Sequence, residues 1–406
     1  MLSPESLYTA PNALARHYSR FRVAERLLLT GHSHQAWPDR GFEAQVQAWV
    51  DAADAVDEKW DRAFAKADRV RAGFARLLGD STGDIALGAN THELVVRLLS
   101  ALPLRERPRI VTTDGEFHSI RRQLDRLAEE GVEIVKVPSD PPDAVAARVA
   151  ATVDDRTAAA LVSSVLFRNA HIVPGLDRAL EACDRVGAQL LVDAYHALNI
   201  VPVSLPAEGL EGAFVVGGGY KYCQLGEGNC FLRFPAGCEL RPAITGWFSE
   251  FGVLTEVTEG REPVGGVVYG AGPDRFAGST YDPTSHYRAA AVFDFFEEQE
   301  LTPDFLRGVS QHQIATLARG FDRLDADPKR ISRDRTTPIE GLGGFLALRS
   351  PFASVLHSAL RERGVRTDYR DDLLRFGPAP YLSDSQLDET LEALSDAIAS
   401  LEGREF

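Results

Sequence analysis

Residues 215 to 228 read VVGGGYKYCQLGEG, where a short apolar run leads into three glycines and then into Lys221 between two tyrosines. Glycine lets the backbone turn sharply and lets a ligand approach closely. A lysine that is partly desolvated in such a place loses its proton easily and can form a covalent bond with an aldehyde carbon. The alternative interpretation is a glycine-rich loop with an exposed lysine, so the segments around it must distinguish the two.

The composition limits the classes of protein and partner. The chain has 406 residues, of which 44% are hydrophobic, and its formal net charge is −15. This length supports two domains, and the acidic charge argues against nucleic acid as a main partner. No apolar run approaches the roughly 20 residues of a membrane span, and the N-terminus lacks the apolar segment of a signal peptide. The four cysteines lack paired metal-ligand spacing. We therefore expect a cytoplasmic protein without a metal site or a membrane partner.

Short apolar runs alternate with amphipathic helical segments from about residue 84 to residue 235. The predicted strands are IALG, RIVTT, VEIVKVP, AALVSSVLF, QLLVDAYH, GAFVVGGG and CFLRFP, at residues 85–88, 109–113, 132–138, 159–167, 189–196, 212–219 and 230–235. Strand–helix–strand alternation of this kind predicts an α/β fold with a mainly parallel seven-stranded-type sheet and helices on both of its faces.

The segments on either side of this region differ from it. Residues 42–78 have apolar positions at helical spacing, residues 251–282 are glycine-rich and irregular, and longer helices with fewer strands follow residue 284. We therefore predict an N-terminal segment at 1–45 that joins the small domain. A large cofactor-binding domain would occupy 46–284, and a small C-terminal α/β domain would occupy 285–406.

Candidate ligand-binding residues follow the predicted strands. Open α/β sheets bind ligands at the carboxyl ends of their strands. GANTHEL, residues 88–94, lies at a strand-to-helix turn, where free backbone N–H groups suit a phosphate. Asn90 or Thr91 could instead merely cap the helix. Asp193 ends an apolar run, with His196 three residues later. A buried carboxylate there needs a cationic partner, unless it only caps the next turn.

An aromatic residue follows the predicted strand 109–113. Phe117, in DGEFHSI, could stack on a flat ring at this edge of the sheet, or it could belong to the core. Together with Lys221, Asp193 and the 88–94 turn, it describes a ligand that is flat, anionic at one end, cationic at a ring nitrogen and equipped with an aldehyde. We therefore predict pyridoxal phosphate (PLP) as the cofactor. Asp193 would hold the ring nitrogen and Lys221 would bind the aldehyde carbon.

Longer motifs surround these positions. They are Asp193-Ala194-Tyr195-His196 followed by Pro202, Tyr220-Lys221-Tyr222, RPAITGWF at 241–248, FAGST at 276–280, LLRFGPAPY at 373–381 and TGHSHQAWP at 30–38. In these motifs the chain resembles the fold-type-I PLP enzymes of the aminotransferase class V group, and within them kynureninase. The resemblance covers most of the chain and implies an aspartate aminotransferase-like fold.

The resemblance also implies roles for individual residues. The cofactor-binding set would be Asn90, Thr91, His92, Phe117, Asp193, His196, Tyr220, Lys221, Trp247 and Ser279, and the substrate-binding set would be His32, Ser33, His34 and Arg375. Lys221, Tyr220 and Asp193 would be catalytic, and Arg375 would hold the substrate α-carboxylate. The resemblance further implies a homodimer, in which Trp247 and Ser279 reach the phosphate of the neighbouring subunit.

The activity implied is that of a hydrolase. It would cleave the Cβ–Cγ bond of kynurenine, 3-hydroxykynurenine or a related γ-oxo amino acid, as in tryptophan catabolism, and release alanine and an aromatic acid. The alternative is a class V aminotransferase or another PLP-dependent lyase that acts on a small amino acid. A cysteine desulfurase is disfavoured, because no cysteine follows Cys238.

Two departures from the kynureninase pattern concern the site. Ile120 stands where the family has a second aspartate, three residues after the stacking Phe. His32 and His34 stand where the family has Asn and Leu. We expect both histidines at the mouth of the site, where each imidazole could contact the substrate and titrate near neutral pH. The alternative is two exposed loop histidines without a role in binding.

Overall fold

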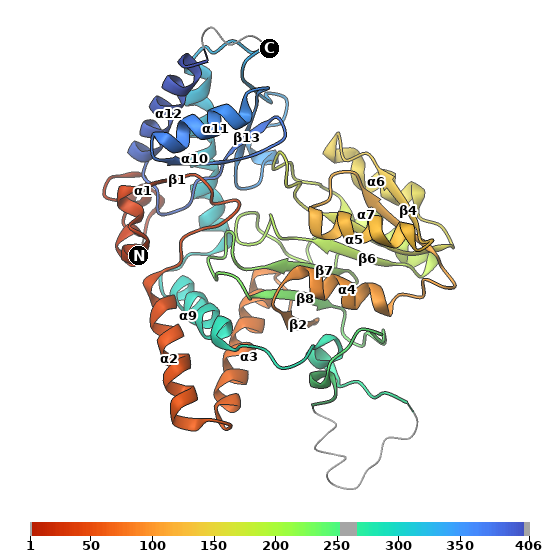
Figure 1. Cartoon of the computed structure of the whole chain (residues 1–406). Helices are drawn as coiled ribbons and strands as arrows, with labels where there is room; N and C mark the ends of the chain where they lie inside the picture. The colour runs from red at the N-terminus through yellow and green to blue at the C-terminus, as the bar shows by residue number, and fades with distance from the viewer. Residues whose placement is uncertain (1, 252–265, 402–406) are drawn as a thin grey trace.

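A seven-stranded sheet forms the centre of the larger body in the computed structural model, which describes residues 2–251 and 266–401 (Figure 1). The strand order is β2-β8-β7-β6-β5-β3-β4. The strand bounds are β2 (Asp84–Gly88), β3 (Arg109–Thr113), β4 (Glu133–Val137), β5 (Thr157–Ser163), β6 (Gln189–Asp193), β7 (Phe214–Gly218) and β8 (Cys230–Phe234). Strand β8 runs antiparallel to both of its neighbours, β2 and β7, while the other neighbouring strands pair in parallel. The expected α/β fold and all seven predicted strands are confirmed.

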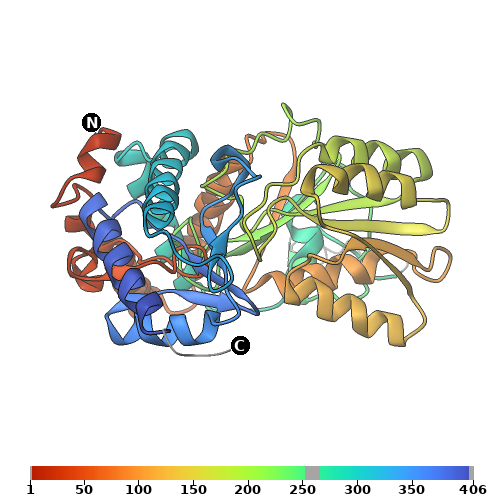
Figure 2. The same ribbon diagram turned by 90° about the horizontal axis from the view of Figure 1, so that it is seen from above.

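Side-chain alternation along the strands creates two apolar layers. Leu161 and Leu191 belong to one core cluster, which includes residues of α4 and α5, while Val162 and Val192 belong to the other, which includes residues of α3, α6 and α7. Helices therefore cover both faces of the sheet (Figure 2). Their bounds are α3 (Lys59–Leu77), α4 (Thr91–Ala101), α5 (His118–Glu129), α6 (Val145–Thr152) and α7 (Leu176–Val186).

The smaller body combines the two ends of the chain (Figure 1). Strand β1 (Leu27–Leu28) pairs in parallel with β11 (Val365–Arg366). A separate antiparallel sheet has the order β12-β13-β10-β9. Its strands are β12 (Asp368–Arg370), β13 (Leu373–Phe376), β10 (Leu346–Arg349) and β9 (Ser332–Arg333). The N-terminal segment thus contacts the C-terminal region, while the domain boundaries at 45/46 and 284/285 stay predictions.

The remaining helices surround these sheets. They are α1 (Pro4–Tyr8), α2 (Asp39–Ala55), α9 (Thr284–Glu298), α10 (Pro303–Arg323), α11 (Ala353–Glu362) and α12 (Asp384–Ala399), with the 3₁₀ helices η1 (Ala15–Phe21), η2 (Val23–Glu25), η3 (Pro142–Ala144), η4 (Trp247–Glu250), η5 (Gly272–Phe276) and η6 (Ile339–Gly341). Helix α9 packs against both α2 and α3. The predicted irregular crossing at 251–282 falls partly outside the described residues. Across the described ranges, no helix combines the length and the apolar character needed to cross a membrane.

A buried ion pair stabilises one end of the large sheet. Arg233 on β8 donates from Nε to Asp80 Oδ2 at 2.5 Å, and from Nη1 to two backbone carbonyl oxygens, at 2.7 Å each. Both side chains of the pair are 1% exposed. Removing the carboxylate alone would leave an unpaired charge in the core.

We expect Asp80→Asn to lower the free energy of unfolding by about 3–5 kcal/mol, because Arg233 stays buried without its counter-charge. Urea unfolding followed by circular dichroism measures the change. The matched control is Asp125→Asn, which breaks an exposed pair with Lys136 and should cost about 0–1 kcal/mol. Equal losses in the two variants would contradict the importance of the buried pair.

Candidate active site

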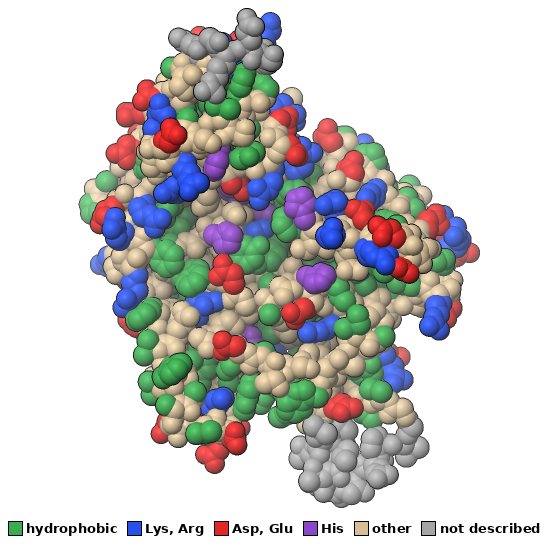
Figure 3. Space-filling model, in the orientation of Figure 1, with side chains coloured by type: hydrophobic (Ala, Val, Ile, Leu, Met, Phe, Trp, Pro, Cys, Tyr) green, Lys and Arg blue, Asp and Glu red, His purple; other side chains and the backbone are tan. Residues whose placement is uncertain are grey.

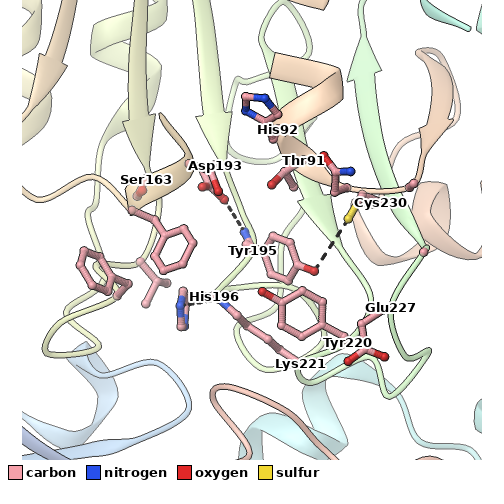
Figure 4. A pocket seen from close by; sticks show the side chains of 17 residues that line it. Thr91, His92, Ser163, Asp193, Tyr195, His196, Tyr220, Lys221, Glu227 and Cys230 are labelled. Atoms are coloured by element: carbon pink, nitrogen blue, oxygen red, sulfur yellow. Dashed lines mark hydrogen bonds between the residues drawn. The ribbon is translucent and has the colours of Figure 1, made fainter. Parts of the chain in front are cut away.

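The carboxyl ends of β5, β6 and β7 and the N-terminus of α4 surround a cavity of about 260 Å³ (Figure 4). Eight of the predicted cofactor-binding residues line it. They are Asn90, Thr91, His92, Phe117, Asp193, His196, Tyr220 and Lys221. The alternation of side chains along the strands explains part of this arrangement. Ser163 and Asp193 stand two positions after Leu161 and Leu191, so they lie on the same face of the sheet, which α4 covers.

Lys221 is the only buried lysine in the described part of the chain, with 5% of its surface exposed. Its Nζ lies 2.6 Å from His196 Nε2 and 4.5 Å from the centre of the Tyr195 ring. Burial lowers the pKa of Lys221 to about 7, although the Asp193 charge acts in the opposite direction. The exposed-loop interpretation of this lysine is therefore wrong, and its amine is available near neutral pH.

The glycine run before Lys221 allows this close packing. A Cβ atom at Gly218 would lie 2.5 Å from both Tyr195 Oη and Cys230 Sγ, which real side chains do not tolerate. A residue with a side chain there would push the strand end away from Tyr195. The glycine therefore permits the tight approach of strand β7 to the wall of the cavity.

Asp193 lies at the end of β6 and is 9% exposed. Its Oδ1 accepts a hydrogen bond from the Tyr195 backbone N–H at 2.9 Å. Within the described ranges, no residue donates a hydrogen bond to Oδ2, and no cationic group lies within ion-pair distance. Burial raises the pKa of Asp193, whereas the charge of Lys221 opposes that shift. The arrangement leaves a carboxylate oxygen free for a cationic N–H group.

The first turn of α4 supplies backbone N–H groups beside the cavity. Asn90 is the N-cap residue: its Oδ1 accepts from Glu93 N at 2.9 Å, and its Nδ2 donates to Glu93 Oε1 at 3.0 Å. The capping interpretation of Asn90 is thus correct, and Asn90 also lines the cavity with Thr91 and His92. A helix N-terminus of this kind attracts an anionic group.

Arg375 lies on β13, is 3% exposed, and does not line the cavity. Its Nε and Nη2 donate to Oδ1 and Oδ2 of Asp368 at 2.8 and 2.6 Å. Its Nη1 donates to the Phe167 backbone oxygen at 2.5 Å. Asp368 faces Arg375 directly across the β12–β13 pair. One edge of the guanidinium group is therefore already held by a carboxylate of the chain.

The expectation that His32 lies at the mouth and titrates near neutral pH is wrong. The ring is fully buried, and its Nε2 lies 2.8 Å from Asp368 Oδ1. Burial lowers the pKa of His32 to about 4, against the opposing effect of Asp368. The ring packs against Gly377, where a Cβ atom would lie 2.2 Å from His32 Nδ1. His32 therefore contacts Asp368, the carboxylate that binds Arg375, and does not line the cavity.

His34 is exposed, as the alternative interpretation expects, yet it contacts residues that line the cavity. Its ring stacks on Tyr220 with centroids 4.9 Å apart, and its Nε2 lies 3.6 Å from Glu227 Oε1. Ser33 Oγ lies 3.2 Å from His34 Nδ1. Figure 3 shows histidine side chains near the middle of the face in view.

Trp247 and Ser279 do not line the cavity that contains Lys221. Trp247 is 45% exposed and donates from Nε1 to Thr280 Oγ1 at 3.1 Å. Ser279 lines a second cavity of about 680 Å³, which shares Ala89 and Gly228 with the first. Within one chain, these two residues therefore lie beside the site and not in it.

Sequence reasoning missed three residues near the site. Glu116 and Ser163 form a buried pair of polar side chains next to Asp193, and Asp368 binds Arg375. The signal for Asp368 was present, since it stands seven residues before Arg375 in a hairpin-like segment. Ile120 lies in the apolar core with Leu124 and does not line the cavity. Among the described residues, no cluster of His, Cys, Asp and Glu could hold a metal ion.

Curated relatives align over most of the chain, while no protein-family model matches it. Isopenicillin N epimerase of Streptomyces clavuligerus is 28% identical and covers 89% of this chain and 90% of its own length. Kynureninase of Deinococcus radiodurans is 25% identical, and the alignment covers 88% of this chain and 83% of the relative's own length. The uncharacterized aminotransferase YcbU of Bacillus subtilis is 22% identical, and the alignment covers 86% of this chain and 89% of the relative's own length.

Solved structures show the fold. A mutant of C-DES with glycine covalently linked to its PLP cofactor superposes with a TM-score of 0.79 at 16% identity, covering 94% of this chain and 98% of its own. The cysteine desulfurase CsdA of Escherichia coli has 16% identity and a TM-score of 0.75, and covers 98% and 99% of the two chains. The chain has the fold of PLP enzymes. The fold expected from the sequence is confirmed by this likeness.

Proposed function

We propose that this protein is a PLP-dependent enzyme that acts on a small amino acid, and that it hydrolyses the Cβ–Cγ bond of a γ-oxo amino acid such as kynurenine. The observation that carries the proposal is Lys221, a buried amine with a lowered pKa, which shares one cavity with the buried Asp193. The kynureninase relative supports the hydrolytic form of the proposal.

The residues present fit PLP. The free Oδ2 of Asp193 suits the ring N–H, and the first turn of α4 suits the phosphate. Phe117 lines the cavity with its ring centroid 5.3 Å from Lys221 Nζ, where it can cover a flat ring. His196 Nδ1 is a buried polar atom without a partner among the described residues. A polar group of a ligand in the cavity would satisfy it.

When bound, PLP withdraws electrons from the Cα atom of an attached amino acid. Asp193 holds the proton on the ring nitrogen, so that this withdrawal stays strong. Lys221 Nζ accepts the Cα proton, and His196 Nε2, 2.6 Å away, holds the amine in position. Tyr220 lines the same cavity and donates a proton to the carbon that loses its acyl group. Water attacks the γ-carbonyl carbon, the Cβ–Cγ bond breaks, and the acyl group leaves as an acid. A proton released from the water replaces the one that Tyr220 gives up, and Lys221 returns its proton to Cα, so that alanine is released.

Arg375 is the proposed ligand of the substrate α-carboxylate. A guanidinium group has five N–H donors, and the three bonds to Asp368 and Phe167 leave one on Nη1 and one on Nη2. The remaining donor on Nη2 lies on the edge between Nη1 and Nη2, which Asp368 does not occupy. We propose that the substrate carboxylate binds at this edge.

We expect Arg375→Lys to raise KM by roughly 10- to 150-fold, which corresponds to a loss of about 1.5–3 kcal/mol of hydrogen bonding to a charged group. Lysine keeps the positive charge and loses the planar fork. Steady-state kinetics with an α-amino acid substrate measures the change, and Arg370→Lys is the control on the neighbouring strand. An unchanged KM would show that another residue binds the carboxylate.

The rate at which the cofactor-free protein captures PLP should rise with pH and level off above about 7, since only the neutral Lys221 amine reacts. The folded-state pKa of about 7 lies below the ordinary lysine value of 10.5, so the reactive form predominates from neutral pH upward. Stopped-flow absorbance between pH 5 and 10 measures this rate. A midpoint above pH 9 would indicate an ordinary solvated lysine.

A second candidate function is transamination, because the same lysine can move a proton between two carbon atoms, and one relative is named as an aminotransferase. Persulfide chemistry is disfavoured, since no cysteine follows Cys238. Incubation with kynurenine, 3-hydroxykynurenine and simple β-acyl alanines, with alanine and the acid product quantified, tests the hydrolase. Formation of a 2-oxo acid without alanine would instead support the aminotransferase.

We also propose a cytoplasmic homodimer, in which Trp247 and Ser279 contact the cofactor phosphate of the partner subunit. The exposure of Trp247 supports this arrangement, as does the neighbouring Phe251, which is 41% exposed. Exposed aromatic side chains next to a cavity are typical of a surface that another chain covers.

A further inference from the structure

Glu116 is a buried carboxyl group that the proposed reaction does not use. It is 2% exposed and immediately precedes Phe117 in the turn between β3 and α5. Its Oε1 accepts from Thr113 Oγ1 at 2.7 Å and from the Ser163 backbone N–H at 3.1 Å. Its Oε2 lies 2.6 Å from Ser163 Oγ. Glu116 is thus tied to the end of β5 by two hydrogen bonds and to the end of β3 by one.

The partner of Glu116 stands beside the proposed ring-nitrogen ligand. Ser163 pairs with Asp193 in the register of β5 and β6, and both residues line the cavity (Figure 4). In the described chain, no Lys, Arg or His lies within ion-pair distance of Glu116. Asp193 is the titratable group whose charge acts on it, while the groups that face it from β3 and β5 are the hydroxyls of Thr113 and Ser163.

Two buried carboxyl groups without a contacting cation cannot both be ionised at low cost. Burial raises the pKa of Glu116 to about 7, and the Asp193 charge adds to the shift, whereas the hydrogen bonds from Ser163 and Thr113 oppose it. Asp193 keeps the better position for a charge, because Lys221 and the proposed ring cation both face it.

We propose that Glu116 is a protonated positioning residue, which donates its proton to Ser163 Oγ, fixes that hydroxyl at the ring-nitrogen end of the cavity and leaves Asp193 as the only anion there. The Ser163 hydroxyl proton is then free to point into the cavity. This inference rests on the proposed function. Glu116 is then a second carboxyl group at this end of the site, beside Asp193. The kynureninase pattern has such a group at position 120, where this chain has the apolar Ile120.

The protonation state is tested in the cofactor-free protein. Infrared spectra should show the carbonyl stretch of a carboxylic acid at pH 5.5, lost with a midpoint near pH 7 and absent in Glu116→Gln. Thermal unfolding gives an independent readout. The folded-state pKa is raised above the ordinary glutamate value of 4.5, so the folded protein keeps a proton that the unfolded chain loses. The Tm of the wild type relative to Glu116→Gln should therefore fall as pH rises from about 4.5 to 7, and stay level above pH 7.

The positioning role is tested by PLP affinity at pH 6, measured by fluorescence titration. Glu116→Gln, a neutral isostere, should bind PLP within about threefold of the wild type, while Glu116→Leu should bind about tenfold more weakly or worse because it removes the bonds to Ser163. Glu116→Asp, which keeps the acid, should recover part of the loss.

The outcomes separate this inference from the proposed function. An acid band that is absent from the wild type, or a Glu116→Gln variant that binds PLP as poorly as Glu116→Leu, would show that a neutral side chain cannot replace Glu116 and overturn the inference. Wild-type affinity in Glu116→Leu would also overturn it. A wild-type protein that binds no PLP would overturn the proposed function instead, because the infrared and unfolding measurements need no cofactor.

Discussion

Lys221→Ala should abolish turnover while the protein stays folded. The variant removes the group that accepts the Cα proton, and the loss of acid–base catalysis alone lowers kcat by roughly 10²–10⁴-fold. No second buried lysine in the described chain can replace it. The small side chain fits the space that Lys221 occupies, so circular dichroism should be unchanged.

Turnover of kynurenine, or of whichever substrate proves active, measures this effect. Lys136→Ala is the matched control, since Lys136 is exposed and pairs with Asp125 on the surface. That variant should keep full activity. A Lys221→Ala enzyme within tenfold of the wild type would remove Lys221 from the chemistry.

Asp193→Asn should retain the fold and much of the bound PLP but lower kcat by about 10²–10³-fold, the usual effect of losing one well-placed electrostatic partner. The amide can still accept the bond from the Tyr195 backbone N–H. It cannot hold a proton on the ring nitrogen, and a neutral ring is a poor electron acceptor.

Steady-state kinetics with saturating PLP separates this loss of kcat from a loss of cofactor. Asp184→Asn, which changes an exposed acid at the end of α7, should behave as the wild type. A near-normal kcat in Asp193→Asn would mean that another group holds the ring nitrogen.

The fold and the wall of the site were predictable because both depend on local patterns. Apolar runs that alternate with helices predict a mainly parallel α/β sheet, and the carboxyl ends of parallel strands lie at one edge of the sheet. Asp193 ends one predicted strand, Lys221 follows the next, and the structure brings them into one cavity. The run of glycines before Lys221 also indicated that the backbone packs closely there, and in the structure Gly218 lies against Tyr195 and Cys230.

The second layer of the site was not predictable, because it depends on contacts between distant segments. His32 looked like a loop residue, yet β13 buries it against Gly377. Arg375 looked like a free carboxylate ligand, yet Asp368 on the paired strand holds one edge of it. Glu116 gave no periodic signal, since its burial depends on Ser163 from another strand.

The most direct test of the account is to map the covalent attachment of PLP. The purified protein is incubated with PLP, reduced with borohydride, digested and analysed by mass spectrometry, with Lys221→Ala treated in parallel. The account predicts a single pyridoxyl-phosphate label on the peptide that contains Lys221 and no specific label in the variant. A label on Lys136 or Lys329, or equal labelling of both proteins, would contradict it.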